Sequence, residues 1–101
     1  MIVYNNTIKV EAAIATQWLR WFAETQAPAI LATGCFSKYH VLQLIEIDES
    51  DGPTYAVQFY ADTLAACETY RQNFENDFQQ QAIARWGNST VSFNTVMQQV
   101  V

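Results

Sequence analysis

Hydrophobic and polar positions alternate along the first ten residues, and the period then changes to that of a helix. The main apolar residues of the first stretch share one parity: Ile2, Tyr4, Ile8 and Val10. Such alternation is typical of a strand with one buried face. From about residue 11, larger side chains recur every three or four positions: Ile14, Trp18, Trp21, Phe22 and Thr25. This spacing predicts an amphipathic helix, which should end or bend before Pro28 and stop at Gly34.

The rest of the chain predicts two more strands, a second helix and a closing strand. We expect strands at 36–47 and 54–61, joined by the polar turn "IDESDGPT". Asp62 or Thr63 is a good N-cap for the second helix. Its apolar face would carry Leu64, Cys67, Tyr70, Phe74 and Phe78. A break near Asn76, a stop at Gly87 and a strand over 90–101 complete the pattern.

This order of elements, β-α-β-β-α-β, predicts a single α+β domain over residues 1–101. Right-handed crossovers give a ferredoxin-like fold, a four-stranded antiparallel sheet with two helices on one face. The strands, however, carry apolar residues at both parities, for example Val41, Ile45 and Ile47 beside Leu42 and Leu44. The uncovered face therefore needs a cover, and we expect a homodimer packed sheet to sheet, as in a dimeric α/β barrel.

Charge and composition narrow the choice of partners. Ten acidic residues against five basic ones give a net charge of −5, which repels phosphate backbones and anionic lipids, so neither nucleic acid nor a membrane is expected as a partner. The N-terminus has no signal-peptide pattern, and the two cysteines, Cys35 and Cys67, suit a reducing compartment as free thiols. A cytoplasmic location is the resulting expectation.

Several chemistries hosted by this fold class lack their residues here. Iron–sulfur and copper sites need closely spaced cysteines, RNA-binding strands need basic residues among the aromatics, and zinc needs more than one histidine and two distant cysteines. Arg20, Arg71 and Arg85 all fall on predicted helices, so no phosphate cradle is expected. The acidic turn lacks calcium-loop spacing and is interpreted as a solvated turn. No metal or cofactor is predicted.

His40 is the best acid–base candidate because it is the only side chain that titrates near neutrality, with Tyr55 or Tyr60 as a nearby partner. The simpler interpretation is a histidine hydrogen-bonded at a sheet or dimer surface. Trp18 and Cys35 are interpreted as packing residues, whereas Trp21 could line a cavity.

Uncharged polar residues also occupy strand interiors, where they need partners. They are Asn5, Thr7, Gln43, Gln58, Ser92 and Asn94. One interpretation is a wet dimer interface, and the other is a small-molecule cavity. The candidate ligand-binding residues on the second interpretation are Asn5, Trp21, His40, Gln58 and Asn94.

Five segments resemble a bacterial family of unknown function: "MIVYNNTIKV", "WLRWF", "PAILATGCF", "TYAVQFYA" and "VSFNTVMQQV". Its members are small ferredoxin-like proteins similar to dimeric α/β-barrel proteins, so the resemblance implies this fold and a dimer. It also implies a histidine two residues before the proline, where this chain has Gln26.

These observations favour a non-catalytic homodimeric domain that binds a small molecule or a protein partner. The alternative is a dimeric α/β-barrel enzyme, oxygenase- or isomerase-like and in one version haem-dependent, using His40 in a cavity. A third hypothesis is a regulatory dimer with its ligand between the two copies.

Overall fold

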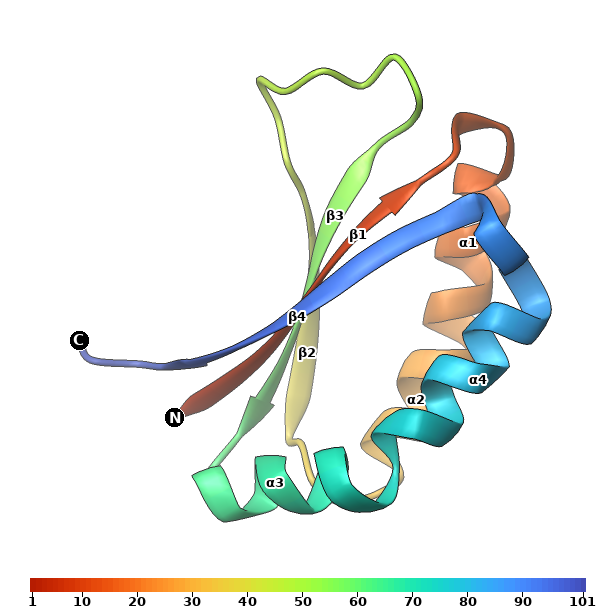
Figure 1. The fold of residues 1–101 in the computed structure, drawn as a ribbon. Helices are drawn as coiled ribbons and strands as arrows, with labels where there is room; N and C mark the ends of the chain where they lie inside the picture. Colours follow the sequence, from red (N-terminus) through yellow and green to blue (C-terminus); the bar gives the residue numbers. More distant parts are fainter.

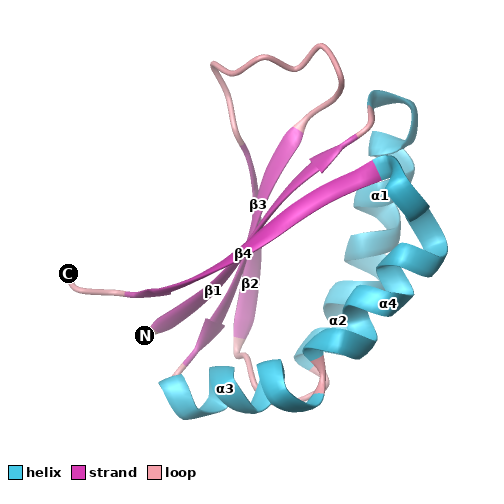
Figure 2. Ribbon diagram, viewed as in Figure 1, coloured by secondary structure: helices cyan, strands magenta, loops and turns pink.

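A computed structural model describes all residues, 1–101, and has the predicted ferredoxin-like fold (Figures 1 and 2). Four antiparallel strands form one sheet in the order β2-β3-β1-β4. Their bounds are β1 Ile2–Val10, β2 Lys38–Gln43, β3 Thr54–Ala61 and β4 Thr90–Gln98. The helices are α1 Ala15–Trp21, α2 Ala27–Leu31, α3 Leu64–Asn73 and α4 Glu75–Trp86. They lie on one side of the sheet, and the other side is uncovered (Figure 1).

The strand register fixes which parity faces the helices. Residues of the helix-facing parity on β1 and β3 are mostly buried, among them Ile2, Tyr4, Ile8, Tyr55, Val57 and Phe59. The uncovered surface, called the open face below, carries the alternate residues. On β4 it bears Val91 and Phe93, which are 71% and 63% exposed, and on β2 it bears Leu42, which is 52% exposed. Both faces of the sheet therefore carry apolar residues, and the helices cover only one of them.

The first helical segment continues through Pro28 by changing its winding. A 3-10 turn, Ala12–Ile14, leads into α1, and a π-helical turn, Phe22–Gln26, joins α1 to α2. Pro28 lies in the first turn of α2, where its missing N–H is tolerated. Gly34 has a φ of 79° beyond the last turn of α2, so the predicted bend and the glycine stop are both confirmed.

The second helical segment begins at its expected cap and breaks slightly earlier than predicted. The Thr63 side-chain oxygen accepts a hydrogen bond from the Ala66 N–H at 3.1 Å, an N-cap of α3. The break lies at Phe74, between α3 and α4, rather than near Asn76. Leu64 is 51% exposed, so its expected place on the buried face is wrong, because it occupies the first turn beside the cap.

Strand β2 is shorter than the predicted 36–47. At its start Phe36 turns into the core, with its ring stacked 5.9 Å from that of Tyr4. At its end the chain leaves the sheet, since Glu46 has a φ of 59° and Ile45 is 76% exposed. Strand β3 matches the predicted 54–61, and β4 ends at Gln98 rather than at residue 101.

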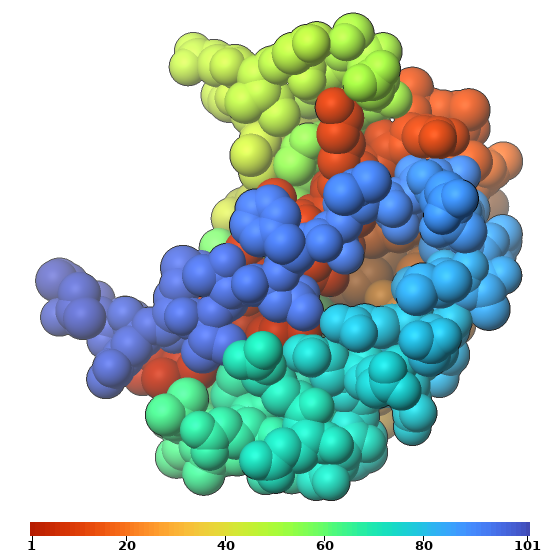
Figure 3. Space-filling view, viewed as in Figure 1, coloured from red at the N-terminus to blue at the C-terminus, as the bar shows by residue number.

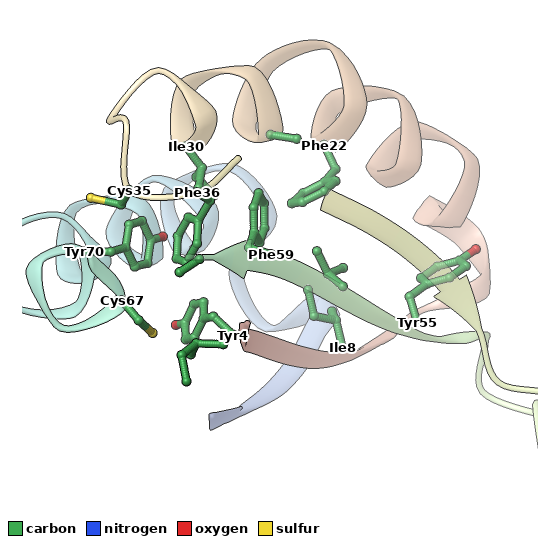
Figure 4. Packing of buried hydrophobic residues seen from close by; sticks show 14 of the residues in the cluster. Tyr4, Ile8, Phe22, Ile30, Cys35, Phe36, Tyr55, Phe59, Cys67 and Tyr70 are labelled. Atoms are coloured by element: carbon green, nitrogen blue, oxygen red, sulfur yellow. The ribbon is translucent and has the colours of Figure 1, made fainter. Parts of the chain in front are cut away.

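The core lies between the helices and β1 and β3, and aromatic rings fill one end of it (Figure 4). Phe36 is central there, with ring centroids 4.9 Å from Tyr70 and 5.3 Å from Phe59. Toward the other end, Trp18 stacks between Phe22 at 5.2 Å and Tyr55 at 5.6 Å. Such offset and tilted contacts add to the hydrophobic contribution of each ring, so Trp18 is a packing residue, as predicted.

The loop between β2 and β3 is tied to the end of β1 through backbone hydrogen bonds. The Ala12 N–H donates to the Asp51 carbonyl at 3.0 Å, and the Val10 N–H donates to the Pro53 carbonyl at 2.9 Å. Gly52 lies between these contacts with a φ of 142°, and a Cβ on it would stand 2.0 Å from the Val10 carbonyl oxygen. Only glycine fits this close crossing.

Candidate functional site

A cavity of about 470 Å³ lies between the sheet and the helices. Its floor comes from β1, β3 and β4, and its walls come from the first helical segment and α4. Figure 3 shows its mouth as a hollow between β4 and α4. The volume falls within the range of small-molecule sites, roughly 300–1,000 Å³.

The inner wall of the cavity is aromatic and apolar. It is formed by Trp18, Phe22, Ile30, Val57, Phe59, Tyr70 and Phe78. Several of these rings also belong to the core, so the inner wall is held by packing on both sides. Trp18, for example, is stacked between Phe22 and Tyr55, so it presents a rigid ring edge to a bound molecule.

The floor near the mouth is polar although it belongs to the helix-facing side of the sheet. Asn6 on β1 pairs directly with Asn94 on β4 in the sheet register, and both line the cavity together with Ser92 and Thr90. The Oδ1 atom of Asn6 is buried and has no hydrogen-bond partner. Because buried amide oxygens almost always accept a hydrogen bond, this unpaired atom is a candidate contact point for a bound molecule.

Glu75 is the only charged residue in the cavity wall. Its Oε2 accepts a short hydrogen bond from the Tyr4 hydroxyl, and the same atom lies 3.4 Å from Nε of Arg71. Burial, followed by the hydrogen bond to Glu75, raises the pKa of Tyr4 above its usual range. Burial and the Glu75 charge also raise the pKa of Tyr70. The carboxylate is therefore already paired, and both tyrosines remain protonated.

Gln26, at the end of the π-helical turn, connects the two helical segments across the cavity. Its Nε2 donates to the Phe78 carbonyl at 3.2 Å. Gln26 and Phe78 both line the cavity, and π-helical turns often occur at functional sites. The position at which the family resemblance implied a histidine is thus a cavity residue with an amide side chain.

The family described as "Domain of unknown function (DUF4286)" matches residues 1–100 of the chain. The chain belongs to the DUF4286 family. No curated protein matches this DUF4286 domain. This assignment agrees with the family of unknown function expected from the five sequence segments.

A solved structure with the same fold supports the architecture of this DUF4286 domain. It is the crystal structure of an ethyl tert-butyl ether degradation (EthD) family protein from Bacillus halodurans C-125. The two superpose with a TM-score of 0.66 at 13% sequence identity, over 99% of this chain and 100% of the other. At that identity the similarity concerns the fold alone, a ferredoxin-like arrangement of one antiparallel sheet with helices on one side.

Three of the sequence-predicted site residues of this DUF4286 domain lie together on the open face. Asn5, Gln58 and His40 form one row across β1, β3 and β2 in the strand register. The Tyr60 hydroxyl joins this row, since it lies 3.3 Å from His40 Nδ1 and donates to Gln58 Oε1 at 3.2 Å. Lys38 Nζ stands 4.9 Å from the centre of the Tyr60 ring. This polar row is on the opposite side of the sheet from the cavity.

The remaining predicted site residues are distributed differently. Asn94 lines the cavity, whereas Tyr55 is buried in the core against Trp18. Trp21 lies outside the cavity wall and packs edge-on against Trp86 at 5.7 Å.

Both cysteines are free and buried, Cys35 at 8% and Cys67 at 0% exposure. Burial raises the pKa of the Cys67 thiol, so it stays protonated.

Asn6 is the cavity residue that the sequence interpretation missed, although a signal was available. It shares the parity of Ile2, Tyr4, Ile8 and Val10, so the alternation itself places an amide in an apolar row. The structure contains no group of three or more histidine, cysteine, aspartate or glutamate side chains arranged to hold a metal ion. None of its helices is long and apolar enough to cross a membrane.

Proposed function

We propose that this protein is a non-catalytic homodimer that binds a small molecule in the cavity between its sheet and its helices. The observation that carries the proposal is the buried, unpartnered Oδ1 of Asn6 in the floor of that cavity. An unpaired buried amide oxygen costs roughly 1–3 kcal/mol of stability. A ligand that donates a hydrogen bond to it would recover this cost, and the aromatic walls would supply apolar contact area.

The open face supports the dimeric part of the proposal. Leu42, Val91 and Phe93 are each more than half exposed on it, and Met97 is 39% exposed. A second copy would cover these side chains and enclose the Asn5–Gln58–His40 row. The net charge of −5 supports a domain that binds neither nucleic acid nor anionic membranes, in keeping with the expected cytoplasmic location.

Native mass spectrometry of freshly purified protein tests both parts at once, because it reports the oligomeric state and any bound molecule. Ala82→Phe fills the cavity from α4, and Ala84→Phe is its matched control on an exposed position of the same helix. We expect a dimer with added mass that persists in Ala84→Phe and is absent in Ala82→Phe. A monomer contradicts the dimer. A bare protein that no member of a metabolite library stabilises against heat contradicts the ligand site.

The His40–Tyr60 hydrogen bond favours a second candidate, an enzyme whose acid–base group lies between two copies rather than in the cavity. Such an enzyme would lose activity in His40→Ala while keeping the cavity ligand. For the haem-dependent version, no histidine, cysteine or methionine lines the cavity. Its two tyrosines, Tyr4 and Tyr70, stay protonated, so His40 on the open face is the candidate haem ligand. Added haem should then give a Soret band that His40→Ala abolishes.

A further inference from the structure

We propose that the cavity selects an uncharged aromatic compound that carries a hydrogen-bond donor, such as a phenol or a ring N–H. This inference deepens the proposed function and rests on it, since it names the chemical class of molecule that the cavity takes. Three properties of the cavity support this inference: its charge, the unpartnered Asn6 oxygen and the aromatic rings of its inner wall.

The charge of the cavity wall excludes an anionic ligand. No lysine, arginine or histidine lines it, and its one charged residue is the Glu75 carboxylate. A carboxylate or phosphate ligand would lose its hydration without gaining a cation, which is strongly unfavourable. A cationic ligand fares little better, because Glu75 Oε2 is already occupied by the Tyr4 hydroxyl and by Arg71 at 3.4 Å. The wall therefore suits a neutral molecule.

The polar floor requires a donor rather than only an acceptor. Asn6 Oδ1 can only accept, and it is buried without a partner. A ligand that presents an ether or ketone oxygen to this atom would leave it unpaired. A hydroxyl or N–H group on the ligand satisfies it, and the neighbouring Asn94 and Ser92 can bond the other side of the same group.

The inner wall favours flat ligands. Trp18, Phe22 and Phe59 are only 2–3% exposed, so their positions are fixed before any ligand binds and little more than the ring edges reaches the cavity. The face of an aromatic ligand packs well against such ring edges, in an edge-to-face arrangement. An apolar cavity of roughly 150 Å³ holds a benzene ring, so about 470 Å³ has room for two fused rings with a polar substituent.

Three naphthalene probes of similar shape separate these properties. 2-Naphthol is neutral and donates, 2-methoxynaphthalene is neutral and only accepts, and 2-naphthoate is anionic. Their dissociation constants are measured by calorimetry on the intact protein, and backbone amide shifts locate the binding site. We expect 2-naphthol to bind about tenfold more tightly than 2-methoxynaphthalene, as one hydrogen bond to a buried acceptor predicts, and 2-naphthoate to bind more weakly than either.

Asn6→Leu tests the role of the amide. It removes the acceptor while keeping a side chain of similar branched shape, so the preference for 2-naphthol over 2-methoxynaphthalene should fall from about tenfold to near unity. Asn5→Leu is the matched control, because Asn5 is adjacent in sequence but lies on the open face, and it should keep the preference. Ala82→Phe should abolish binding of both neutral probes.

The outcomes separate this inference from the proposed function. Equal affinities for naphthol and its methyl ether in the wild-type protein overturn the donor requirement, and tightest binding of naphthoate overturns the neutral class. In both cases the proposal that the cavity binds small molecules still stands, provided that Ala82→Phe abolishes binding of the probes. If no probe binds while mass spectrometry detects a different cavity ligand, the aromatic class alone is wrong. If neither probe nor native ligand occupies the cavity, both proposals fall.

Discussion

Asn6 on β1 and Asn94 on β4 stand directly opposite each other in the sheet, on the side that the helices cover. The other helix-facing residues of β1, such as Tyr4 and Ile8, are buried and largely apolar. Two amides side by side at this depth weaken the fold unless something pairs with them, and the Oδ1 atom of Asn6 is unpaired.

The first prediction follows from that unpaired atom. Asn6→Leu should raise the free energy of unfolding by about 1 kcal/mol, because an apolar residue of similar branched shape removes an unsatisfied acceptor. Urea unfolding of the ligand-free protein measures the change. Asn5→Leu, which breaks the hydrogen bond from Asn5 Nδ2 to Thr7 Oγ1, should not stabilise the protein. A loss of stability in Asn6→Leu would mean that the amide is already satisfied.

The second prediction concerns the open face. Phe93→Asp should convert the proposed dimer to a monomer, since it places a charge on the surface that a second copy would bury. Leu64→Asp is the control, because Leu64 is similarly exposed, 51% against 63%, but lies on the helical side. Sedimentation at micromolar concentration gives the masses. A dimer that survives Phe93→Asp would place the interface elsewhere.

The third prediction concerns Gly52, which passes against the end of β1. Gly52→Ala should lower the free energy of unfolding by about 3–5 kcal/mol, since its Cβ would stand 2.0 Å from the Val10 carbonyl oxygen. Gly34→Ala should cost only about 1–2 kcal/mol, because nothing lies near that position and only its φ of 79° is unfavourable. Thermal unfolding distinguishes the two, and equal losses would contradict the contact.

The fourth prediction is a loss of stability at high pH. The pKa values of Tyr4 and Tyr70 are raised in the folded protein, chiefly by burial and then by Glu75. Above the ordinary tyrosine pKa of 10.0 the unfolded chain therefore loses protons that the folded chain keeps. The stability that is fully present below pH 10 should then fall by about 1.4 kcal/mol per pH unit for each tyrosine.

Denaturant unfolding between pH 9 and about 11.5 measures this slope. Tyr4→Phe and Tyr70→Phe should each make the decline shallower, and the double variant more so. Tyr39→Phe, which removes a hydroxyl from β2, serves as the control. A wild-type slope unchanged by both substitutions would show that other groups cause the alkaline loss.

The sequence predicted the features that depend on a few neighbouring residues. The strand 54–61, the Thr63 cap and the glycine stops at residues 34 and 87 each depend on local alternation or on one backbone conformation. The overall fold could also be predicted, because the order of strands and helices is compatible with few topologies. The late start of β2 was not foreseen, because it depends on Phe36 turning into a core that forms only in three dimensions.

The cavity could not be derived from the sequence because it depends on how far α4 stands from β4. Periodicity gives the face that a helix buries but not the gap beneath it. The sequence predicts the polar strand residues as one group, and only the strand register assigns them to the two faces of the sheet. Asn94 and Ser92 line the cavity, whereas Asn5 and Gln58 lie on the open face. Asn6 could have been identified as a helix-facing polar residue from its parity in the sequence alone.

The π-helical turn at Phe22–Gln26 also sets how the first helical segment tolerates changes in length. A π-turn holds one residue more than an α-turn, and each residue of an α-helix rotates the next by about 100°. Removing one residue from 22–26 would therefore restore regular α-helical winding while later side chains such as Ile30 keep facing the sheet. Relatives that are one residue shorter here would keep the fold and differ only in the cavity wall around Gln26.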